Sequence, residues 1–150
     1  MARETERKFL VAGRRWRKRS DPGKAIRQAY LALTDTISIR VRAVGKSKAF
    51  ITIKSAGSGT TRSEFEYPIP FKDARELMKL RTGRLIKKRR HVVKVGKTRI
   101  EVDVFKGDHR GLVIAEVELP SSRARFIPPD WLSKEITGRK KYYNANLARQ

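Results

Sequence analysis

The sequence has 150 residues, and 37 lysines and arginines against 15 aspartates and glutamates give it a net charge of +22. This excess indicates polyanionic partners, namely phosphates, nucleic acid or an acidic membrane surface, and does not decide the fold. The lack of cysteine excludes disulfides and thiolate metal sites, and two histidines disfavour an imidazole-rich zinc site. No stretch approaches the roughly 18 apolar residues of a membrane helix, and residues 1–11 show no apolar signal region, so we expect a cytoplasmic protein.

In chain order, eight segments show the alternation of polar and apolar residues that is typical of β-strands. They are Glu4–Val11, Ile26–Leu33, Thr36–Val44, Ala49–Ser55, Thr61–Pro68, Arg84–Val95, Thr98–Phe105 and Leu112–Leu119. Between two of them, Gly96-Lys97 predicts a tight hairpin of the primed type. For Ile26–Leu33 the alternative is a short helix that opens at Asp21-Pro22.

Two helices are predicted between and after these strands. Phe71–Arg81 has its apolar residues on one helical face. Asp130 is a suitable N-cap for a second helix over Trp131–Ile136, and a final helical piece is expected over Lys141–Arg149. The chain shows no internal repeat, low-complexity tract or linker, so residues 1–150 are predicted to form one domain.

Charged residues recur at alternate positions on the predicted strands, so on each strand they share one face. For a single strand the usual interpretation is a solvated face opposite an apolar core face. This set is unusual because it holds eight of the 15 carboxylates and seven basic residues, a net charge of −1, whereas the rest of the chain carries +23. Its members are Glu4, Glu6, Lys8, Arg40, Arg42, Lys54, Arg62, Glu64, Glu66, Lys88, Arg90, Glu101, Asp103, Glu116 and Glu118.

The predicted fold class is mainly β (α+β), a closed eight-stranded antiparallel β-barrel with a few flanking helices. We expect the charge-balanced set on the interior face and the apolar strand faces outward under the helices. Buried charges are costly unless they are paired or bind ions. Clustered carboxylates without histidine or cysteine favour hard cations such as Mg²⁺ or Mn²⁺, and arginine and lysine bind phosphate oxygens. The interior therefore suits phosphoryl transfer.

The residues also resemble a known family over essentially the whole chain. Glu4-Thr5-Glu6-Arg7-Lys8 is similar to the Glu-x-Glu-x-Lys signature of the CYTH superfamily, the triphosphate tunnel metalloenzymes. Further segments follow in the family's order: Ile39–Arg42, Phe50–Ser55, Arg62–Glu66, Lys88–Arg90, Glu101–Phe105, Ala115–Glu118, Phe126–Pro129 with Trp131, and Lys140–Tyr142 with Asn144. The small bacterial inorganic triphosphatases are the most similar members. The His-Phe pair that often precedes the signature in class IV adenylate cyclases is replaced by Met1-Ala2-Arg3.

The resemblance implies a tunnel that binds Mg²⁺ or Mn²⁺ and hydrolyses a linear triphosphate, most of all inorganic tripolyphosphate, to pyrophosphate and phosphate. By position it implies a metal site at Glu4, Glu6, Glu66, Glu101, Asp103, Glu116 and Glu118. It implies substrate contacts at Lys8, Arg40, Arg42, Lys54, Arg62, Lys88 and Arg90, with catalytic roles for Glu4, Glu6 and Lys8. Tyr30 and Gln28 are expected to face the tunnel, and Lys140 or Lys141 to cover one mouth.

Two other functions stay open at this point. A cyclase-like activity, or a thiamine or nucleoside triphosphatase, needs a pocket for an organic ring, and no sequence feature identifies one. A non-enzymatic module would bind polyphosphate or nucleic acid on the basic exterior, where Arg14–Arg19 with Trp16 offers a patch, although a solvated loop is the preferred interpretation. Trp131 is interpreted as a packing residue, and His91 and His109 as surface residues. A homodimer is compatible with the sequence.

Overall fold

The computed structural model describes residues 5–55 and 63–149, so the predicted site residues Glu4 and Arg62 lie outside the described residues. The strands are β1 (Thr5–Val11), β2 (Lys24–Leu33), β3 (Ile37–Val44), β4 (Lys48–Ser55), β5 (Glu64–Pro68), β6 (Thr82–Val95), β7 (Thr98–Lys106), β8 (Val113–Leu119) and β9 (Leu132–Glu135). The helices are α1 (Phe71–Met78) and α2 (Asn144–Arg149), with the 3₁₀ turns η1 (Arg15–Arg19), η2 (Gly107–His109) and η3 (Lys140–Tyr142).

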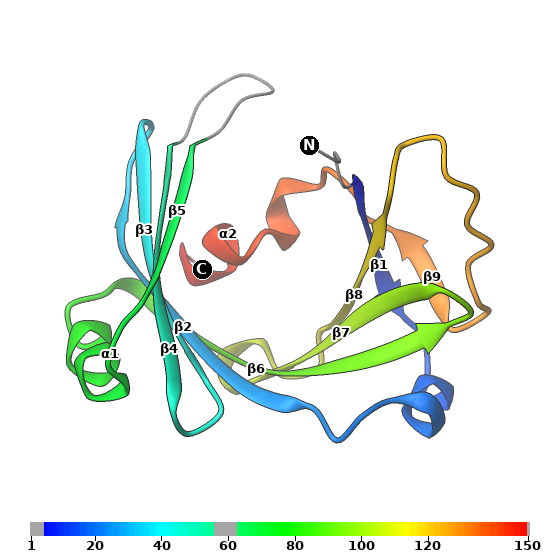
Figure 1. The fold of residues 1–150 in the computed structure, drawn as a ribbon, viewed down its shortest axis with the longest axis horizontal. Coiled ribbons are helices and arrows are strands. Elements are labelled where there is room, and N and C mark those ends of the chain that lie inside the picture. The colour runs from blue at the N-terminus through cyan, green and yellow to red at the C-terminus, as the bar shows by residue number, and fades with distance from the viewer. Residues whose placement is uncertain (1–4, 56–62, 150) are drawn as a thin grey trace.

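All nine strands form one antiparallel sheet in the order β5-β4-β3-β2-β6-β7-β8-β1-β9. The sheet curves strongly: β3, β4 and β5 form one wall, β8, β1 and β9 the opposite wall, and the C-terminal segment lies between them (Figure 1). Within the described ranges no pairing joins β5 to β9, the two ends of the ladder. The predicted architecture, mainly antiparallel β with a few helices, is confirmed, and each of the eight predicted strands is present.

The strand β2 settles one open alternative, because it is extended where a short helix was the other choice. Asp21 does not start a helix. Its Oδ1 accepts hydrogen bonds from the backbone N–H groups of Gly23 at 3.1 Å and Val92 at 2.9 Å, which ties the turn to β6. The β6–β7 hairpin turns at Gly96, whose φ of 61° is the positive value that a primed turn requires.

The segment after Asp130 is a strand, so the helix predicted over Trp131–Ile136 is wrong. Most of this segment forms β9, which pairs with β1, and the N–H of Ile136 extends the contact to the carbonyl oxygen of Lys8 at 2.8 Å. Asp130, the expected N-cap, forms an ion pair with Arg15. Without β9, β1 would be an edge strand with unpaired backbone groups, so sheet pairing outweighs a local capping signal.

The apolar strand faces point outward and are covered, as predicted. On one side Ala74 and Met78 of α1 pack with the outer residues of β2, β3 and β4. On the other side Trp16 of η1 and Trp131 pack on the outer faces of β1, β6, β7 and β8, which confirms the packing role of Trp131. The convex face therefore carries two of the hydrophobic clusters formed by the described residues, which leaves part of the concave face for polar side chains.

On the convex face the structure excludes the stacking alternative for Trp16, and the surface interpretation of His91 is wrong. Trp16 is 2% exposed, and its ring meets the His91 ring edge-on with centroids 5.1 Å apart, so Trp16 cannot stack on a nucleic-acid base. His91 is buried beneath it, with Nδ1 3.1 Å from the carbonyl oxygen of Asp21. His109 is half-buried, with Nε2 2.9 Å from the carbonyl oxygen of Leu147.

None of the helices in residues 5–55 and 63–149 has the length and apolarity needed to cross a membrane.

Candidate active site

The concave face of the sheet encloses a cavity of about 610 Å³. Six strands contribute charged side chains to its lining, because every second residue of a strand points to the same face. Nine of the predicted charged residues meet here: Glu6, Lys8, Arg40, Arg42, Lys54, Arg90, Glu101, Glu116 and Glu118. Tyr30 also lines the cavity, as expected. The alternation in the sequence therefore brings together residues that lie more than 100 positions apart.

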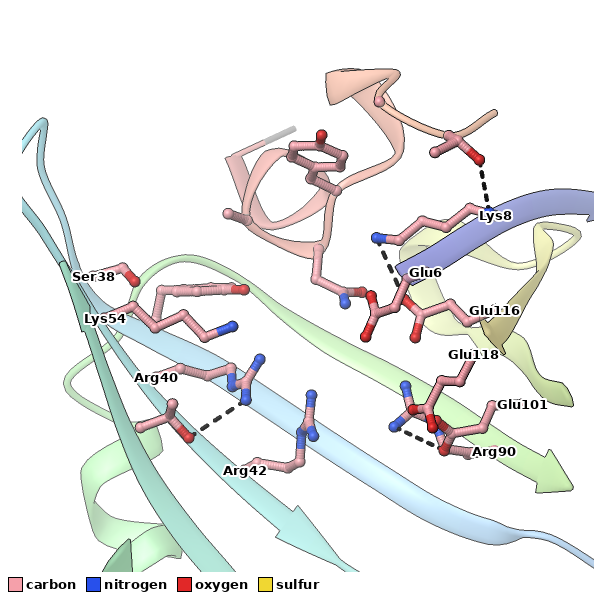
Figure 2. A pocket seen from close by; sticks show the side chains of 17 residues that line it. Glu6, Lys8, Ser38, Arg40, Arg42, Lys54, Arg90, Glu101, Glu116 and Glu118 are labelled. Atoms are coloured by element: carbon pink, nitrogen blue, oxygen red, sulfur yellow. Dashed lines mark hydrogen bonds and ion pairs between the residues drawn. The ribbon is translucent and has the colours of Figure 1, made fainter. Parts of the chain in front are cut away.

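The charges are separated across the cavity (Figure 2). The basic wall, from β3 and β4, consists of Arg40, Arg42 and Lys54. The acidic wall, from β1, β7 and β8, consists of Glu6, Glu101, Glu116 and Glu118. Two cations, Lys8 and Arg90, lie on the same side as these carboxylates (Figure 2). An anion in the cavity would face the basic wall, and a cation would face the acidic wall.

The basic wall is short of counter-charge. Arg42 donates from Nε to Oε1 of the fully buried Gln28 at 3.0 Å, and Arg40 donates from Nη2 to Oγ1 of Thr52 at 3.4 Å. The buried Nε of Arg40 has no hydrogen-bond partner among the described residues. Burial, followed by repulsion from Arg40 and Arg90, lowers the pKa of Arg42 to about 10. A bound anion would give the Arg40 Nε a hydrogen-bond partner and would offset the repulsion among the arginines.

The acidic wall has more negative charge than the neighbouring cations Lys8 and Arg90 supply in positive charge. Glu6 is accessible to solvent within the cavity, yet enclosure by the walls, followed by repulsion from Glu116, raises its pKa, and Lys8 only partly opposes this. The Lys8 ammonium lies 3.3 Å from a carboxylate oxygen of Glu116, and Nη1 of Arg90 lies 3.4 Å from a carboxylate oxygen of Glu101. The remaining negative charge is the kind that a bound cation neutralises.

Behind the cavity, Arg90 is held by a buried carboxylate. Its Nε and Nη2 donate to the two oxygens of Asp103 at 2.8 and 2.9 Å, and Nζ of Lys88 lies 2.8 Å from Oδ2 of Asp103. Burial acts to raise the pKa of Asp103, but Lys88 and Arg90 outweigh it and hold that pKa at about 2. Burial lowers the pKa of Lys88 to about 8 in spite of Asp103. Neither Asp103 nor Lys88 lines the cavity, so the structure does not bring them to the metal and substrate positions predicted for them.

The acidic residues of β5 stand apart from the other predicted site residues. Glu64 and Glu66 are exposed on this edge strand and do not line the cavity. Glu64 lies 3.8 Å from the Lys54 ammonium, and Glu66 accepts a hydrogen bond from Oγ1 of Thr52 at 3.4 Å. The metal role predicted for Glu66 has no support from its position.

The C-terminal segment supplies lining residues that the strand pattern does not predict. They are Thr137, Gly138, Tyr143, Asn144 and Ala145. Lys140 and Lys141, expected to cover a mouth, are exposed and do not line the cavity. The residues on either side of these two lysines therefore line the site with uncharged groups.

One end of the concave face is filled by α2. Leu147 and Ala148 pack there with Ile136 against inward-facing residues of four strands. These strand residues are Leu10, Ile86, Phe105 and Ile114. On each of the four strands, the apolar residue lies two positions from a charged residue on the same inward face. This change from charged to apolar residues at one end of the inward face is the sequence signal that indicates the covered end.

Comparison with known proteins agrees with this arrangement. The CYTH domain profile matches residues 2–149. The chain belongs to the CYTH family. It is 38% identical over 150 residues to the inorganic triphosphatase of Acetivibrio thermocellus, covering 99% of this chain and 95% of the relative. It is 38% identical over 149 residues to the inorganic triphosphatase of Nitrosomonas europaea, covering 97% and 96%. A crystal structure of an inorganic triphosphatase matches with a TM-score of 0.77 at 35% identity, covering 100% of this chain and 97% of that one.

The CYTH family implies a divalent metal ion, and the acidic wall of this CYTH chain fits one. No three acidic or histidine side chains in the described parts of the chain are already gathered around one point as metal ligands. The donors are nevertheless of the right chemistry, because Glu6, Glu101, Glu116 and Glu118 offer hard carboxylate oxygens. Burial, followed by repulsion from Glu116, raises the pKa of Glu6, and a cation between these carboxylates would relieve that repulsion.

Proposed function

We propose that this CYTH chain hydrolyses a linear triphosphate in a divalent-metal-dependent reaction, with inorganic tripolyphosphate as the substrate and pyrophosphate and phosphate as the products. The observation that carries the proposal is the division of one cavity into a basic wall and an acidic wall (Figure 2). Two relatives that match nearly the full length are inorganic triphosphatases, which supports the same activity here.

The basic wall binds the substrate in this proposal. Guanidinium and ammonium groups of Arg40, Arg42 and Lys54 contact phosphate oxygens, for which arginine offers two parallel donors. The unpartnered Nε of Arg40 is one donor available for this purpose among the described residues. Lys8 and Arg90 contact the same anion from the opposite side, so the triphosphate is held between the walls.

The acidic wall holds the metal ion in this proposal, through Glu6, Glu101, Glu116 and Glu118, with Glu4 as a further ligand predicted from the sequence. Mg²⁺ or Mn²⁺, when bound, would neutralise charge on the phosphate oxygens. Water attacks the terminal phosphorus in line with the leaving group, and the phosphorus–oxygen bond to pyrophosphate breaks. The basic wall stabilises the negative charge that develops on pyrophosphate.

An inorganic substrate suits the lining better than an organic triphosphate. The cavity is lined mainly by charged side chains, and the apolar residues at one end are already covered by Leu147 and Ala148 of α2. A thiamine or nucleoside ring would need an open apolar or stacking surface. The cavity of this chain gives such a ring little to contact beyond Tyr30 and Tyr143.

Phosphate release from tripolyphosphate, ATP and thiamine triphosphate tests the proposal, with Mg²⁺, with Mn²⁺ and with EDTA. The variants are Glu6→Gln and, as a control, Glu76→Gln on α1, whose carboxylate pairs with Lys79 outside the cavity. We expect metal-dependent release, fastest from tripolyphosphate, that Glu6→Gln abolishes and Glu76→Gln leaves intact. Release from none of the three, with tight metal-independent binding of polyphosphate or RNA, would contradict the proposal and indicate a basic binding module.

Three further properties are proposed from the sequence alone: a single domain over residues 1–150, a cytoplasmic location and a homodimer. The polyanion-binding exterior belongs with them, as an expectation from the net charge of +22. Light scattering at several protein concentrations measures the oligomeric state directly.

A further inference from the structure

We propose that the C-terminal segment positions Lys8, and that the ring of Tyr143 fixes the location of the Lys8 ammonium in the cavity. This inference rests on the proposed function, because it concerns a residue proposed to contact the triphosphate. It adds Tyr143, which lies 135 positions away in the chain, as a positioning residue for the reaction.

The backbone of Lys8 is held on both sides by the C-terminal segment. Its N–H donates to Oγ1 of Thr137 at 3.0 Å, and its carbonyl oxygen accepts from the N–H of Ile136 at 2.8 Å. The Thr137 hydroxyl in turn donates to Oε2 of Glu135 at 2.7 Å. These contacts continue the β1–β9 pairing past the end of β9, so the position of Lys8 along β1 depends on residues 135–137.

The side chain of Lys8 has two partners. Its ammonium lies 5.0 Å from the centre of the Tyr143 ring and 3.3 Å from a carboxylate oxygen of Glu116. A lysine side chain is a flexible chain of four carbons, so an ion pair with one carboxylate leaves the ammonium free to move around that carboxylate. The ring face attracts the same cation from a second direction without neutralising it. Two directions of attraction fix the ammonium at the cavity and leave it available to a phosphate oxygen.

Tyr143 can act in this way because α2 holds it. The carbonyl oxygen of Tyr143 accepts from the N–H groups of Asn146 and Leu147, both at 2.9 Å, which makes Tyr143 the first residue to join the hydrogen bonds of α2. Leu147 is buried in the apolar core that fills one end of the concave face, and its carbonyl oxygen lies 2.9 Å from Nε2 of His109. The anchored helix therefore sets the ring beside Lys8.

The experiment compares Tyr143→Leu and Tyr143→Phe with Tyr142→Leu as the matched control. Tyr142 is the neighbouring residue of the same type, contacts Arg139 and Lys141, and does not line the cavity. It packs against the same apolar core as Leu147, so its replacement measures general loosening of the segment. A phenylalanine ring keeps the cation contact and a leucine loses it, so we expect the KM for tripolyphosphate to rise about fivefold in Tyr143→Leu and to stay within about twofold of wild type in Tyr143→Phe. In Tyr142→Leu we expect a KM within about twofold of wild type.

A double-mutant cycle on tripolyphosphate affinity, measured by calorimetry, separates positioning from general loosening of the segment. If Tyr143 acts through Lys8, Tyr143→Leu has no further effect in a Lys8→Gln background. Equal losses in Tyr143→Leu and Tyr142→Leu, or an undiminished loss in the Lys8→Gln background, would overturn the inference while the proposed hydrolysis stands.

Lysine side-chain NMR tests the contact without any activity. The Hε resonances of Lys8 should lie upfield in wild type and Tyr143→Phe, because of the ring current, and move to ordinary lysine values in Tyr143→Leu. Ordinary values in wild type would overturn the inference. A wild-type protein that releases no phosphate but shows the upfield shift would overturn the proposed function and leave the positioning of Lys8 supported.

Discussion

Arg90 and Asp103 lie opposite each other on β6 and β7, and two hydrogen bonds of 2.8 and 2.9 Å join the guanidinium to the two carboxylate oxygens. Lys88, on the same face of β6, brings a second cation to 2.8 Å from the same carboxylate. One buried carboxylate thus balances two cations, and Arg90 is held where it can reach Glu101 and the cavity.

This arrangement predicts unequal effects of two substitutions on stability. Asp103→Asn leaves two cations facing a neutral amide and should lower the free energy of unfolding by roughly 3–5 kcal/mol. Lys88→Met leaves the Arg90–Asp103 pair intact and removes a desolvated ammonium, so it should change that free energy by less than about 1.5 kcal/mol. Urea denaturation at neutral pH measures both. An equal loss in the two variants would contradict this prediction and show that Lys88 contributes as much to stability as the Asp103 carboxylate does.

The same carboxylate predicts a dependence of stability on pH. The pKa of Asp103 falls from its ordinary value of 3.8 to about 2 in the folded chain, so its contribution is present above pH 3.8 and is lost as the pH falls through 2. We expect wild type to lose roughly 2 kcal/mol more than Asp103→Asn between pH 5 and pH 2. Glu135, whose pKa is also about 2 through hydrogen bonds from Arg7 and Thr137, titrates in both proteins and cancels in this comparison. Parallel acid unfolding of the two proteins would contradict the assignment.

The inward-facing charges could be predicted from the sequence because a pleated strand fixes the face of each residue. The alternation at Glu116 and Glu118 leaves a single choice, because the opposite face of that strand is apolar, and Glu6 and Lys8 share one face of β1 in the same way. The alternation does not say how deep in the cavity each residue lies. The sequence therefore predicts Asp103 at the cavity, whereas the structure places it behind Arg90.

Contacts between segments that are distant in the sequence could not be predicted from local patterns. The helix expected over Trp131–Ile136 rested on a local capping signal, and pairing with β1 overrides that signal. The sequence predicts a helical piece where α2 lies, but the position of α2 over one end of the cavity depends on contacts of Leu147 with apolar residues from four strands. Periodicity within α2 carries no information about those partners.

The covered end predicts a severe effect of a small change at Gly83. Its φ is 72°, and a Cβ added there would lie 2.4 Å from the carbonyl oxygen of Ala148. Gly83→Ala should therefore displace α2, lower stability by roughly 2 kcal/mol or more, and speed hydrogen exchange in residues 144–149.

Gly45→Ala is the matched control for Gly83. Gly45 also has a positive φ, 64°, but nothing lies within 4 Å of an added Cβ, so only backbone strain of about 1 kcal/mol is expected. Exchange in residues 144–149 should be unchanged in this control. The same exchange pattern in both variants would mean that α2 does not depend on the close approach at Gly83.

The hydroxyl of Thr137 predicts a link between the C-terminal segment and the site. Thr137→Val keeps the shape but removes the acceptor for the Lys8 N–H and the donor to Glu135, at a cost of about 1 kcal/mol in stability. Affinity for tripolyphosphate, measured by calorimetry, should fall because Lys8 is less well placed. Ser133→Ala removes a comparable hydroxyl contact, to the carbonyl oxygen of Leu10 at 2.9 Å, outside the cavity lining. Ser133→Ala should leave the affinity for tripolyphosphate unchanged. An equal fall in both variants would contradict a specific role of Thr137 in placing Lys8.

The two-walled cavity is tested most directly by a crystal structure with Mn²⁺ and a non-hydrolysable imido analogue of tripolyphosphate. The anomalous signal of Mn²⁺ should lie among Glu6, Glu116 and Glu118, and the phosphorus atoms should lie between that signal and the guanidinium groups of Arg40 and Arg42. Manganese and analogue bound on the outer surface, with the cavity holding neither, would contradict the account.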